Sequence, residues 1–270
     1  MLLVWKKLKL HIAGSISATA NWQLNWQCLL QKITRLQADH DVDLWLKQLN
    51  HIPSSKVVAF VNAHAMNSAA ACDEFFQTLS AADVIFRDGS GLALLLKNLK
   101  MSPGVNLNGT DLIPRIIQQF DNQKIALLGT QEPYLEQAKQ QIFAMLAPNS
   151  QITSANGFES ESSYIDLVKQ FQPDLVILGM GMPKQELVAQ VLRVNLQQPC
   201  LIVSGGAIID FLGGKVKRAP LWMRQAGVEW LYRLLLEPRR LFFRYVIGNP
   251  LFIFRVNRFQ FTNNQAGKIQ

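Results

Sequence analysis

The sequence predicts an α/β fold of the doubly wound, Rossmann-like type, with a mostly parallel sheet, helices on both faces, and a basic amphipathic helical appendage at the C-terminal end. Three observations predict it. From about residue 56, short β-branched runs alternate with longer helical stretches, which is typical of βαβ units. Several of the short runs are apolar almost throughout, as expected for strands buried on both faces. After Gly214 the chain becomes rich in Arg and large apolar side chains.

The expected elements follow from this alternation. Six strands are expected at 56–63, 82–88, 124–130, 151–156, 174–179 and 200–204. Helices fit the stretches between them, at 65–80, 90–99, 110–121, 133–146, 161–171 and 183–196. Pro133 and Pro183 fall at first-turn positions of two helices, where the missing proline N–H costs nothing.

The chain is expected to divide into an α/β domain at 1–214, a basic appendage at 215–258 and a disordered tail at 259–270. Residues 1–55 are the least patterned part, and their tryptophans among Leu and Ile suggest a strand followed by amphipathic helices. The appendage holds ten Lys and Arg against two Glu, a net charge of +8. Residues 1–214 hold sixteen Lys and Arg against seventeen Asp and Glu, a net charge of −1.

Within the appendage, Pro238 should end one helix and begin the next. Four charged residues recur at i, i+4, i+7 and i+11, namely Arg233, Glu237, Arg240 and Arg244. A continuous or gently kinked helix would present them on one face.

The composition is that of a globular chain, with 49% hydrophobic and 17% charged residues. A charged residue or a proline interrupts each long apolar stretch before the roughly 18 to 20 residues that a membrane helix needs. Lys6, Lys7 and Lys9 follow a very short apolar run, the reverse order of a secretory signal, so a cytoplasmic protein is expected. The three cysteines and four histidines lack metal-ligand spacing, so no metal site is expected.

Ligands of a doubly wound sheet bind outside the carboxyl ends of its strands. The first such junction is Asp88 with Gly89, in the run RDGSG. An Asp at a strand end, followed by glycines that let a ligand approach the backbone, suits a general base or a ribose ligand. Equally, Asp88 could cap the helix that starts near Ser90.

Further junctions carry polar residues beside glycine. Gly109, Thr110 and Asp111 open a helix, and a cap by Thr110 is the favoured interpretation. Gly129 ends an apolar strand and is a weak nucleotide-binding signal. The candidates of the next junction are Gly181, Lys184, Gln185 and Glu186, where a helix N-terminus favours an anionic ligand. Gly205 and Gly206, with Asp210 and the basic loop that contains Arg218, form either a diphosphate cradle or a hinge beside a solvated charge run.

Together these residues resemble the WecG/TagA/CpsF glycosyltransferase family, glycosyltransferase family 26. Five motifs carry the resemblance: RDGSG at 87–91, GTDL at 109–112, GMGMPKQE at 179–186, GGAIIDFLGGKVKRAP at 205–220 and VEWLYRLLLEPRRLFFRYVIGNP at 228–250. It covers roughly residues 56–255 in unbroken order.

The resemblance implies inverting transfer of a sugar, often N-acetylmannosamine, from a UDP-sugar to a polyprenyl-diphosphate-linked sugar. Such steps build teichoic acid linkage units, enterobacterial common antigen or exopolysaccharide. It also implies catalysis without a bound metal or other cofactor, and an appendage that covers the active site and engages an anionic membrane. The protein is therefore expected at the inner face of the bacterial cytoplasmic membrane, with no nucleic-acid partner; a homo-oligomer is compatible with the sequence.

Residue by residue, the resemblance implies that Asp88 is the catalytic base and that Arg233 and Arg240 bind the diphosphate. Asn62 matches an Asn usually found after the first family strand. The chain departs from the family pattern at four positions: Phe60 for Thr, His64 for Glu, Asn106 for Arg and Phe243 for Arg. These departures leave the donor sugar open.

Two other classes of protein would share part of this pattern. A dinucleotide-dependent oxidoreductase should show GxGxxG after its first strand and an acidic ribose ligand about twenty residues on, and the sequence shows neither. A non-catalytic RNA- or DNA-binding module would use the basic segment, with a steep salt dependence and no need of Asp88. Thermal stabilisation of the protein by UDP would distinguish a glycosyltransferase from these two classes.

Overall fold

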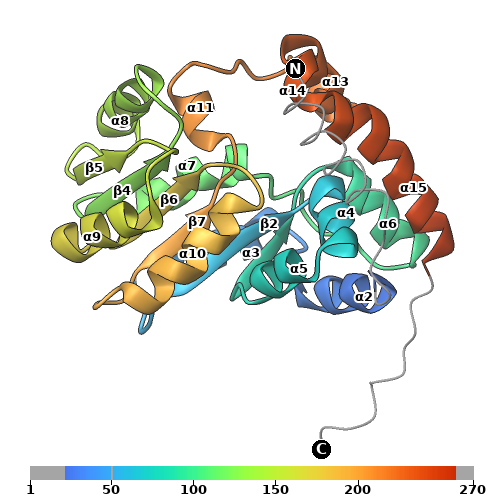
Figure 1. Cartoon of the computed structure of the whole chain (residues 1–270), viewed down its shortest axis with the longest axis horizontal. Helices are drawn as coiled ribbons and strands as arrows, with labels where there is room; N and C mark the ends of the chain where they lie inside the picture. The colour runs from blue at the N-terminus through green and yellow to red at the C-terminus, as the bar shows by residue number, and fades with distance from the viewer. Residues whose placement is uncertain (1–21, 50, 260–270) are drawn as a thin grey trace, which may run out of the picture.

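The structure, a computed structural model, describes residues 22–49 and 51–259. Seven parallel strands form one sheet in the order β1-β3-β2-β7-β6-β4-β5 (Figure 1). The strands are Ile33–Thr34 (β1), Lys56–Val61 (β2), Val84–Arg87 (β3), Lys124–Gly129 (β4), Gln151–Ala155 (β5), Leu175–Gly179 (β6) and Leu201–Ser204 (β7). The predicted doubly wound α/β fold is confirmed, and all six expected strands are present.

The helices before β7 flank the sheet. They are Trp22–Lys32 (α2), Asp39–Gln48 (α3), Ala63–Ala71 (α4), Asp73–Ser80 (α5), Ser90–Asn98 (α6), Gly109–Gln119 (α7), Tyr134–Met145 (α8), Glu161–Phe171 (α9) and Lys184–Asn195 (α10). The single helix expected at 65–80 is wrong, because Cys72 has extended backbone angles that separate α4 from α5. Pro133 and Pro183 occupy the N-cap positions of α8 and α10 rather than their first turns.

Alternate side chains of each strand pack on opposite faces of the sheet. In β2, Val58 and Phe60 join the cluster that contains Ile113 of α7. Ala59 and Val61 point the other way, into the cluster that contains Met66 of α4. Both faces are therefore buried, which explains the nearly continuous apolar runs of the sequence.

The N-terminal part of the chain agrees with the prediction of amphipathic helices, since α2 and α3 bury one face each. The strand expected near the start of the sequence lies outside the described residues. Residues 260–270 of the tail expected to be disordered also lie outside them. The expectation is wrong for its first residue, because Phe259 is buried with its ring centre 5.5 Å from that of Trp26.

Short helices follow β7 and end in a longer one that packs against α4 and against Trp26 of α2. They are Ile208–Leu212 (α11), Leu221–Gln225 (α12), Glu229–Leu236 (α13), Pro238–Phe242 (α14), the π-helix Phe243–Ile247 (η1) and Gly248–Arg258 (α15). Pro238 ends α13 and begins α14, as predicted. Among the described residues, no helix is both long and apolar enough to cross a bilayer.

Helix α15 is docked on the body of the protein. Its Phe252 ring lies 5.4 Å from the ring of Trp26 in α2. Asn67 of α4 donates to the carbonyl oxygen of Gly248 at 2.7 Å and accepts at Oδ1 from Nη1 of Arg255 at 3.0 Å. These contacts hold the C-terminal helices beside α4 and α6, next to the carboxyl edge of the sheet (Figure 1). The boundary expected at residue 214 stays a prediction.

Candidate active site

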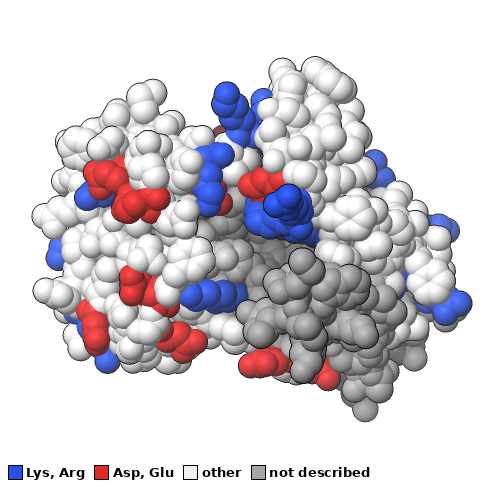
Figure 2. All heavy atoms as spheres, turned by 45° about the horizontal axis from the view of Figure 1, so that its top comes forward, with Lys and Arg blue, Asp and Glu red and all other residues white. Residues whose placement is uncertain are grey.

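The parallel sheet brings the predicted site residues to one edge. β3, β2, β7 and β6 are neighbours, so the residues after them lie in a row at the carboxyl edge. The row runs from Asp88 through Asn62 and Gly206 to Gly181. Lys and Arg side chains gather in the middle of this face, beside a hollow between the body and the C-terminal helices (Figure 2).

Asp88 is held by its neighbour strand. Its backbone N–H donates to the carbonyl oxygen of Val61 at 2.8 Å, and its Oδ2 accepts from Nδ2 of Asn62 at 3.2 Å. Oδ1 of Asn62 caps α4 by accepting from the N–H of Ala65 at 3.1 Å. The alternative interpretation of Asp88 as a helix cap is wrong, because the N-cap of α6 is Gly89 and no side chain bonds to it as a cap.

The surroundings of Asp88 change its pKa in two opposing directions. Burial raises the pKa of Asp88 above its ordinary value, and this is the largest effect. The hydrogen bond from Asn62 and the positive charges of Arg244, Arg233 and Arg87 act in the opposite direction and lower that pKa. A carboxylate with a raised pKa is a better proton acceptor than an exposed one, which suits a general base.

The loop that carries Asp88 is fixed by Arg87, a buried residue at the end of β3. Its guanidinium donates to the carbonyl oxygens of Pro103, Gly89 and Gly104, each at 3.0 to 3.1 Å. It also donates to Oδ1 of Asn106, which accepts from the N–H of Gly89 as well. Asn106, one of the departures from the family pattern, therefore holds the Asp88 loop in place.

Arginines of the C-terminal segment lie close enough to Asp88 and Glu229 to act on their charges, beside the hollow in Figure 2, which we call the crevice. The guanidinium of Arg233 lies 5.5 Å from the ring centre of Phe211, and that of Arg244 lies 5.4 Å from the ring centre of Tyr245. Buried Nε atoms without a hydrogen-bond partner in the described structure belong to Arg218, Arg224, Arg233 and Arg244. Unused buried donors are rare in proteins, so this group is suited to an anion with several oxygens.

Arg240 has a different setting. Its side chain is exposed and pairs with Glu237 of the preceding turn, with Nε donating to Oε2 at 2.5 Å. Arg233 and Arg244, by contrast, both act electrostatically on Asp88. Arg233 was expected from the sequence, and Arg244 was not. The signal was present, since Arg244 follows Arg233 at i+11 on the predicted face.

Glu229, at the start of α13, is a second charged residue that sequence reasoning missed. Burial raises its pKa, while Arg218 and Arg233 lower it and Asp88 raises it further. These mutual influences place Glu229 in the same charged group as Asp88. A Glu in the first turn of a helix is common, so the sequence offered no signal.

A pocket of about 430 Å³ adjoins the crevice beside α7 and α11. Its lining includes Thr110, Phe211, Gly214 and Arg218. Arg218 pairs with Asp111 at the rim, with Nη2 donating to Oδ2 at 3.2 Å. The cap of α7 is Asn108, whose Oδ1 accepts from the N–H of Asp111, so the expectation of a cap by Thr110 is wrong.

The turn at 179–186 is tied into the body. Gln185 and Glu186 are buried, and Oε1 of Gln185 accepts from the N–H of Gly206 at 2.9 Å. Nζ of Lys184 donates to the carbonyl oxygen of Gly157 at 2.8 Å and lies over the ring of Tyr164. Gly181 and Gly206, by contrast, have positive φ and open space where a side chain would be. Their backbone is accessible to a ligand, as their sequence context predicts.

The remaining candidates have packing roles in the structure. A Cβ on Gly129 would lie 2.5 Å from the carbonyl oxygen of Gly179, and one on Gly205 would lie 2.4 Å from the Ile208 side chain. Gly109 lies in α7 close to Gly205. Asp210 accepts hydrogen bonds from Thr130 and, at 3.1 Å, from Nζ of Lys215. Ligand roles for these residues stay predictions.

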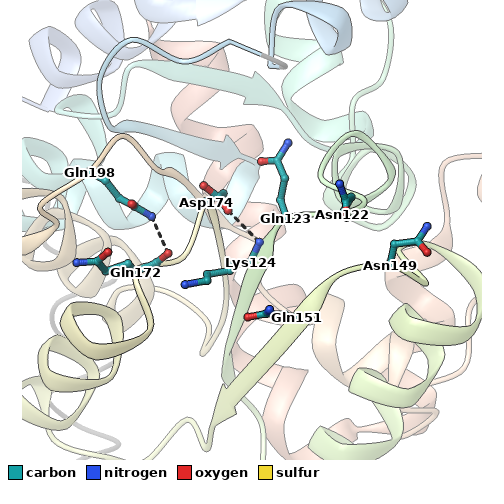
Figure 3. A pocket seen from close by; sticks show the side chains of 8 residues that line it. All are labelled: Asn122, Gln123, Lys124, Asn149, Gln151, Gln172, Asp174 and Gln198. Carbon is teal, nitrogen blue, oxygen red and sulfur yellow. Dashed lines mark hydrogen bonds between the residues drawn. The ribbon is translucent and has the colours of Figure 1, made fainter.

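A second pocket, of about 330 Å³, lies at the opposite, amino edge of the sheet (Figure 3). It is lined by polar side chains: Asn122, Gln123, Lys124, Asn149, Gln151, Gln172, Asp174 and Gln198. Asp174 is engaged there, since its Oδ2 accepts from the N–H of Lys124 at 2.9 Å. In the described ranges, no cluster of three or more His, Cys, Asp or Glu could hold a metal ion.

Comparison with known proteins assigns a family to this arrangement. The model of the glycosyl transferase WecG/TagA/CpsF family matches residues 26–266. The chain belongs to this family. The resemblance seen in the motifs is thus confirmed, and as a WecG/TagA/CpsF protein the chain is a hexosyltransferase. The oxidoreductase and the nucleic-acid-binding module are set aside.

Curated relatives of this WecG/TagA/CpsF protein include N-acetylglucosaminyldiphosphoundecaprenol N-acetyl-beta-D-mannosaminyltransferases of Staphylococcus aureus. Those of strains NCTC 8325 / PS 47 and COL are each 26% identical over 215 residues, 77% of this chain and 82% of the relative. That of strain MRSA252 is 25% identical over the same length.

Proposed function

We propose that this enzyme transfers N-acetylmannosamine or a related hexose from a UDP-sugar to a polyprenyl-diphosphate-linked sugar, with inversion, in bacterial cell-surface polysaccharide synthesis. The names of the curated relatives support the acceptor class and the sugar. The observation that carries the proposal is the meeting of Asp88 with Arg233 and Arg244, two arginines whose buried Nε atoms have no hydrogen-bond partner in the described structure.

The proposed reaction is a single displacement. Asp88 takes the proton of the acceptor hydroxyl, and the acceptor oxygen forms a bond to the anomeric carbon of the donor. The bond from that carbon to UDP breaks, and UDP leaves with the electron pair. A positioned base contributes roughly 10² to 10⁴-fold in rate.

The departing diphosphate gains negative charge, and the arginines are placed to meet it. The proposed ligands are Arg218, Arg233 and Arg244, because their unused Nε donors accompany planar guanidinium groups that bind phosphate oxygens in pairs. Such preorganised charge is usually a large part of catalysis. We therefore also propose that transfer needs no metal ion, so activity should persist in excess EDTA.

The acceptor is membrane-bound, so we propose peripheral attachment at the inner face of the cytoplasmic membrane. Support comes from large apolar side chains that are exposed on the C-terminal helices: Leu221, Trp222, Leu231, Leu235, Leu236, Phe242, Ile253 and Phe254. The same segment carries the net +8. Basic residues near anionic lipid are worth about 1 kcal/mol each, so a few of them suffice for attachment.

One assay tests the proposed function. Purified protein is incubated with a panel of UDP-sugars and a short-chain polyprenyl-diphosphate-linked N-acetylglucosamine, and the product mass is read. We expect one added N-acetylhexosamine or hexose, formed roughly 10² to 10⁴-fold more slowly by Asp88→Asn. Failure of all UDP-sugars, together with no stabilisation of the protein by UDP, would overturn the proposed donor class.

A further inference from the structure

A carboxyl group is buried at the start of α10, directly behind the carboxyl edge of the sheet. The side chain of Glu186 is only 2% exposed and that of Gln185 only 1%. Nε2 of Gln185 donates to Oε1 of Glu186 at 2.8 Å. Oε2 of Glu186 has no hydrogen-bond partner in the described structure. The substrate-binding role expected for Glu186 from the sequence would require exposure that it does not have.

Both ends of the Gln185 amide are in use. Its nitrogen donates to Glu186, and its oxygen accepts from the N–H of Gly206 at 2.9 Å. A side-chain amide has one acceptor end and one donor end, so only this orientation makes both bonds. A rotated amide would place donor against donor at Gly206. By accepting from Nε2 of Gln185, Glu186 supports the amide orientation that Gly206 needs.

The bond from Gly206 to Gln185 holds a turn that faces the proposed donor site. Gly205 is packed against the side chains of Ile208 and Ile113, and Gly206 has φ of +61° with open space on its outer side. The turn is thus held from the inside by Gln185 and faces the crevice with its outer side. A change in the Gln185 amide would move the backbone that lines the proposed donor site.

We propose that Glu186 is a positioning residue that acts in its neutral form, by orienting Gln185 so that the Gly205–Gly206 turn keeps the shape that the donor diphosphate requires. The inference rests on the proposed function for the role of the turn. It assigns to Glu186 no contact with substrate.

The surroundings of Glu186 favour the neutral acid. Of the elements packed against α10, β6 and β7 carry no ionisable side chain. The charged residues of the others are exposed: Lys56, Asp73, Glu74, Glu161, Asp166 and Lys169. Tyr164 of α9 is buried and its hydroxyl donates to Asn156. On α10 itself, Lys184 donates to Gly157 and Arg193 pairs with Asp83.

Burial consequently raises the pKa of Glu186 to about 7, against the smaller opposing effects of Gln185 and its own backbone N–H. Ionisation would place an unpaired negative charge behind a site that must receive an anion. Catalytic efficiency should then decline as pH rises above this value.

The test compares Glu186→Gln, which keeps an acceptor oxygen and cannot ionise, with Glu186→Met, which has neither property. The matched control is Asp166→Asn, an exposed carboxyl on α9. The first readout needs no turnover: amide exchange at Gly206 in labelled protein. We expect wild-type protection in Glu186→Gln, and exchange about tenfold faster in Glu186→Met because one hydrogen bond is lost.

The second readout is kcat/KM for the UDP-sugar between about pH 6 and about pH 9. Wild type and Asp166→Asn should lose efficiency at the alkaline end through a raised KM, and Glu186→Gln should not. The proposal is overturned if Glu186→Gln loses Gly206 protection, or if it keeps the wild-type alkaline decline. Because amide exchange is independent of transfer, a failure of the proposed donor class remains distinguishable from a failure of this proposal.

Discussion

Asn62 donates a 3.2 Å hydrogen bond to Oδ2 of Asp88 from the adjacent strand, so the proposed base is oriented by a residue 26 positions earlier in the chain. The same Asn62 side chain caps α4 with its oxygen, which fixes the direction of its amide. Together these two bonds fix the Asn62 side chain between α4 and the carboxylate of Asp88.

Replacing Asp88 with Asn should lower kcat by roughly 10² to 10⁴-fold, the usual contribution of a positioned base. The substitution keeps the size of the side chain and removes its ability to accept a proton. The rate is measured as lipid-linked product formed from the active UDP-sugar. Wild-type turnover with an unchanged melting temperature would exclude Asp88 as the base.

Replacing Arg244 with Gln should move the acidic limb of the pH profile to higher pH. Arg244 lowers the pKa of Asp88, so its loss raises that pKa and the base ionises only in a more alkaline solution. UDP should also bind more weakly, as measured by calorimetry. Arg239 is exposed on α14, and Arg239→Gln is the control that should leave both quantities unchanged.

Glu186 should make stability depend on pH. Its pKa rises from 4.5 in the unfolded chain to about 7 in the folded protein, so the folded state holds a proton that the unfolded state loses in this range. The stability that it contributes is complete below the unfolded value and is lost as pH rises through about 7. Glu186→Gln should therefore be more stable than wild type at alkaline pH, by on the order of 3 kcal/mol, and similar to it near pH 4.5.

Urea denaturation at several pH values measures this difference. Asp166→Asn, which removes an exposed carboxyl, should show no such trend. A gain from Glu186→Gln that is the same at every pH would show that the carboxyl does not titrate in this range.

The exposed apolar side chains of the C-terminal helices should determine membrane attachment. Trp222 and Leu235 are 65% and 71% exposed, and replacing both with Gln should reduce flotation with anionic liposomes several-fold. Phe158, which is 77% exposed in the loop before α9, supplies the control Phe158→Gln. Equal loss in both variants would contradict attachment through this segment.

Asn67 should hold the C-terminal helices on the body. Its replacement by Ala removes the donor to Gly248 and the acceptor for Arg255, so unfolding should become easier by about 1 to 3 kcal/mol. Hydrogen exchange in α15 should accelerate. Asn195→Ala, which removes a bond within one helix, is the control and should leave exchange in α15 unchanged.

The strands could be predicted from the sequence because parallel strands buried on both faces are nearly continuous apolar runs. The carboxyl edge could be predicted because the polar residues that follow parallel strands lie at one edge of the sheet. The break at Cys72 could not, since both halves of 65–80 have helical periodicity and only the backbone of one residue separates them. The π-helix at 243–247 could not be predicted either, because the sequence there has the same helical periodicity as its neighbours.

Side-chain direction limited the site prediction. The run Lys184, Gln185 and Glu186 resembled a ligand-binding turn, but only the packing of α10 on the sheet shows that two of the three point inward. In a helical projection, Arg240 and Arg244 fall on the same face, so the sequence alone does not show which of them binds the diphosphate. The pairing of Arg240 with Glu237 and the reach of Arg244 to Asp88 depend on the geometry around η1.

The docking of Phe252 against Trp26 also affects synthesis of the chain. The ring of Trp26 can pack against α4 and α5 early, but it gains the ring of Phe252 only after α15 has been synthesised. Until then one side of the Trp26 ring lacks its C-terminal partners, so the segment that carries Arg233 and Arg244 is held on the body only late in synthesis.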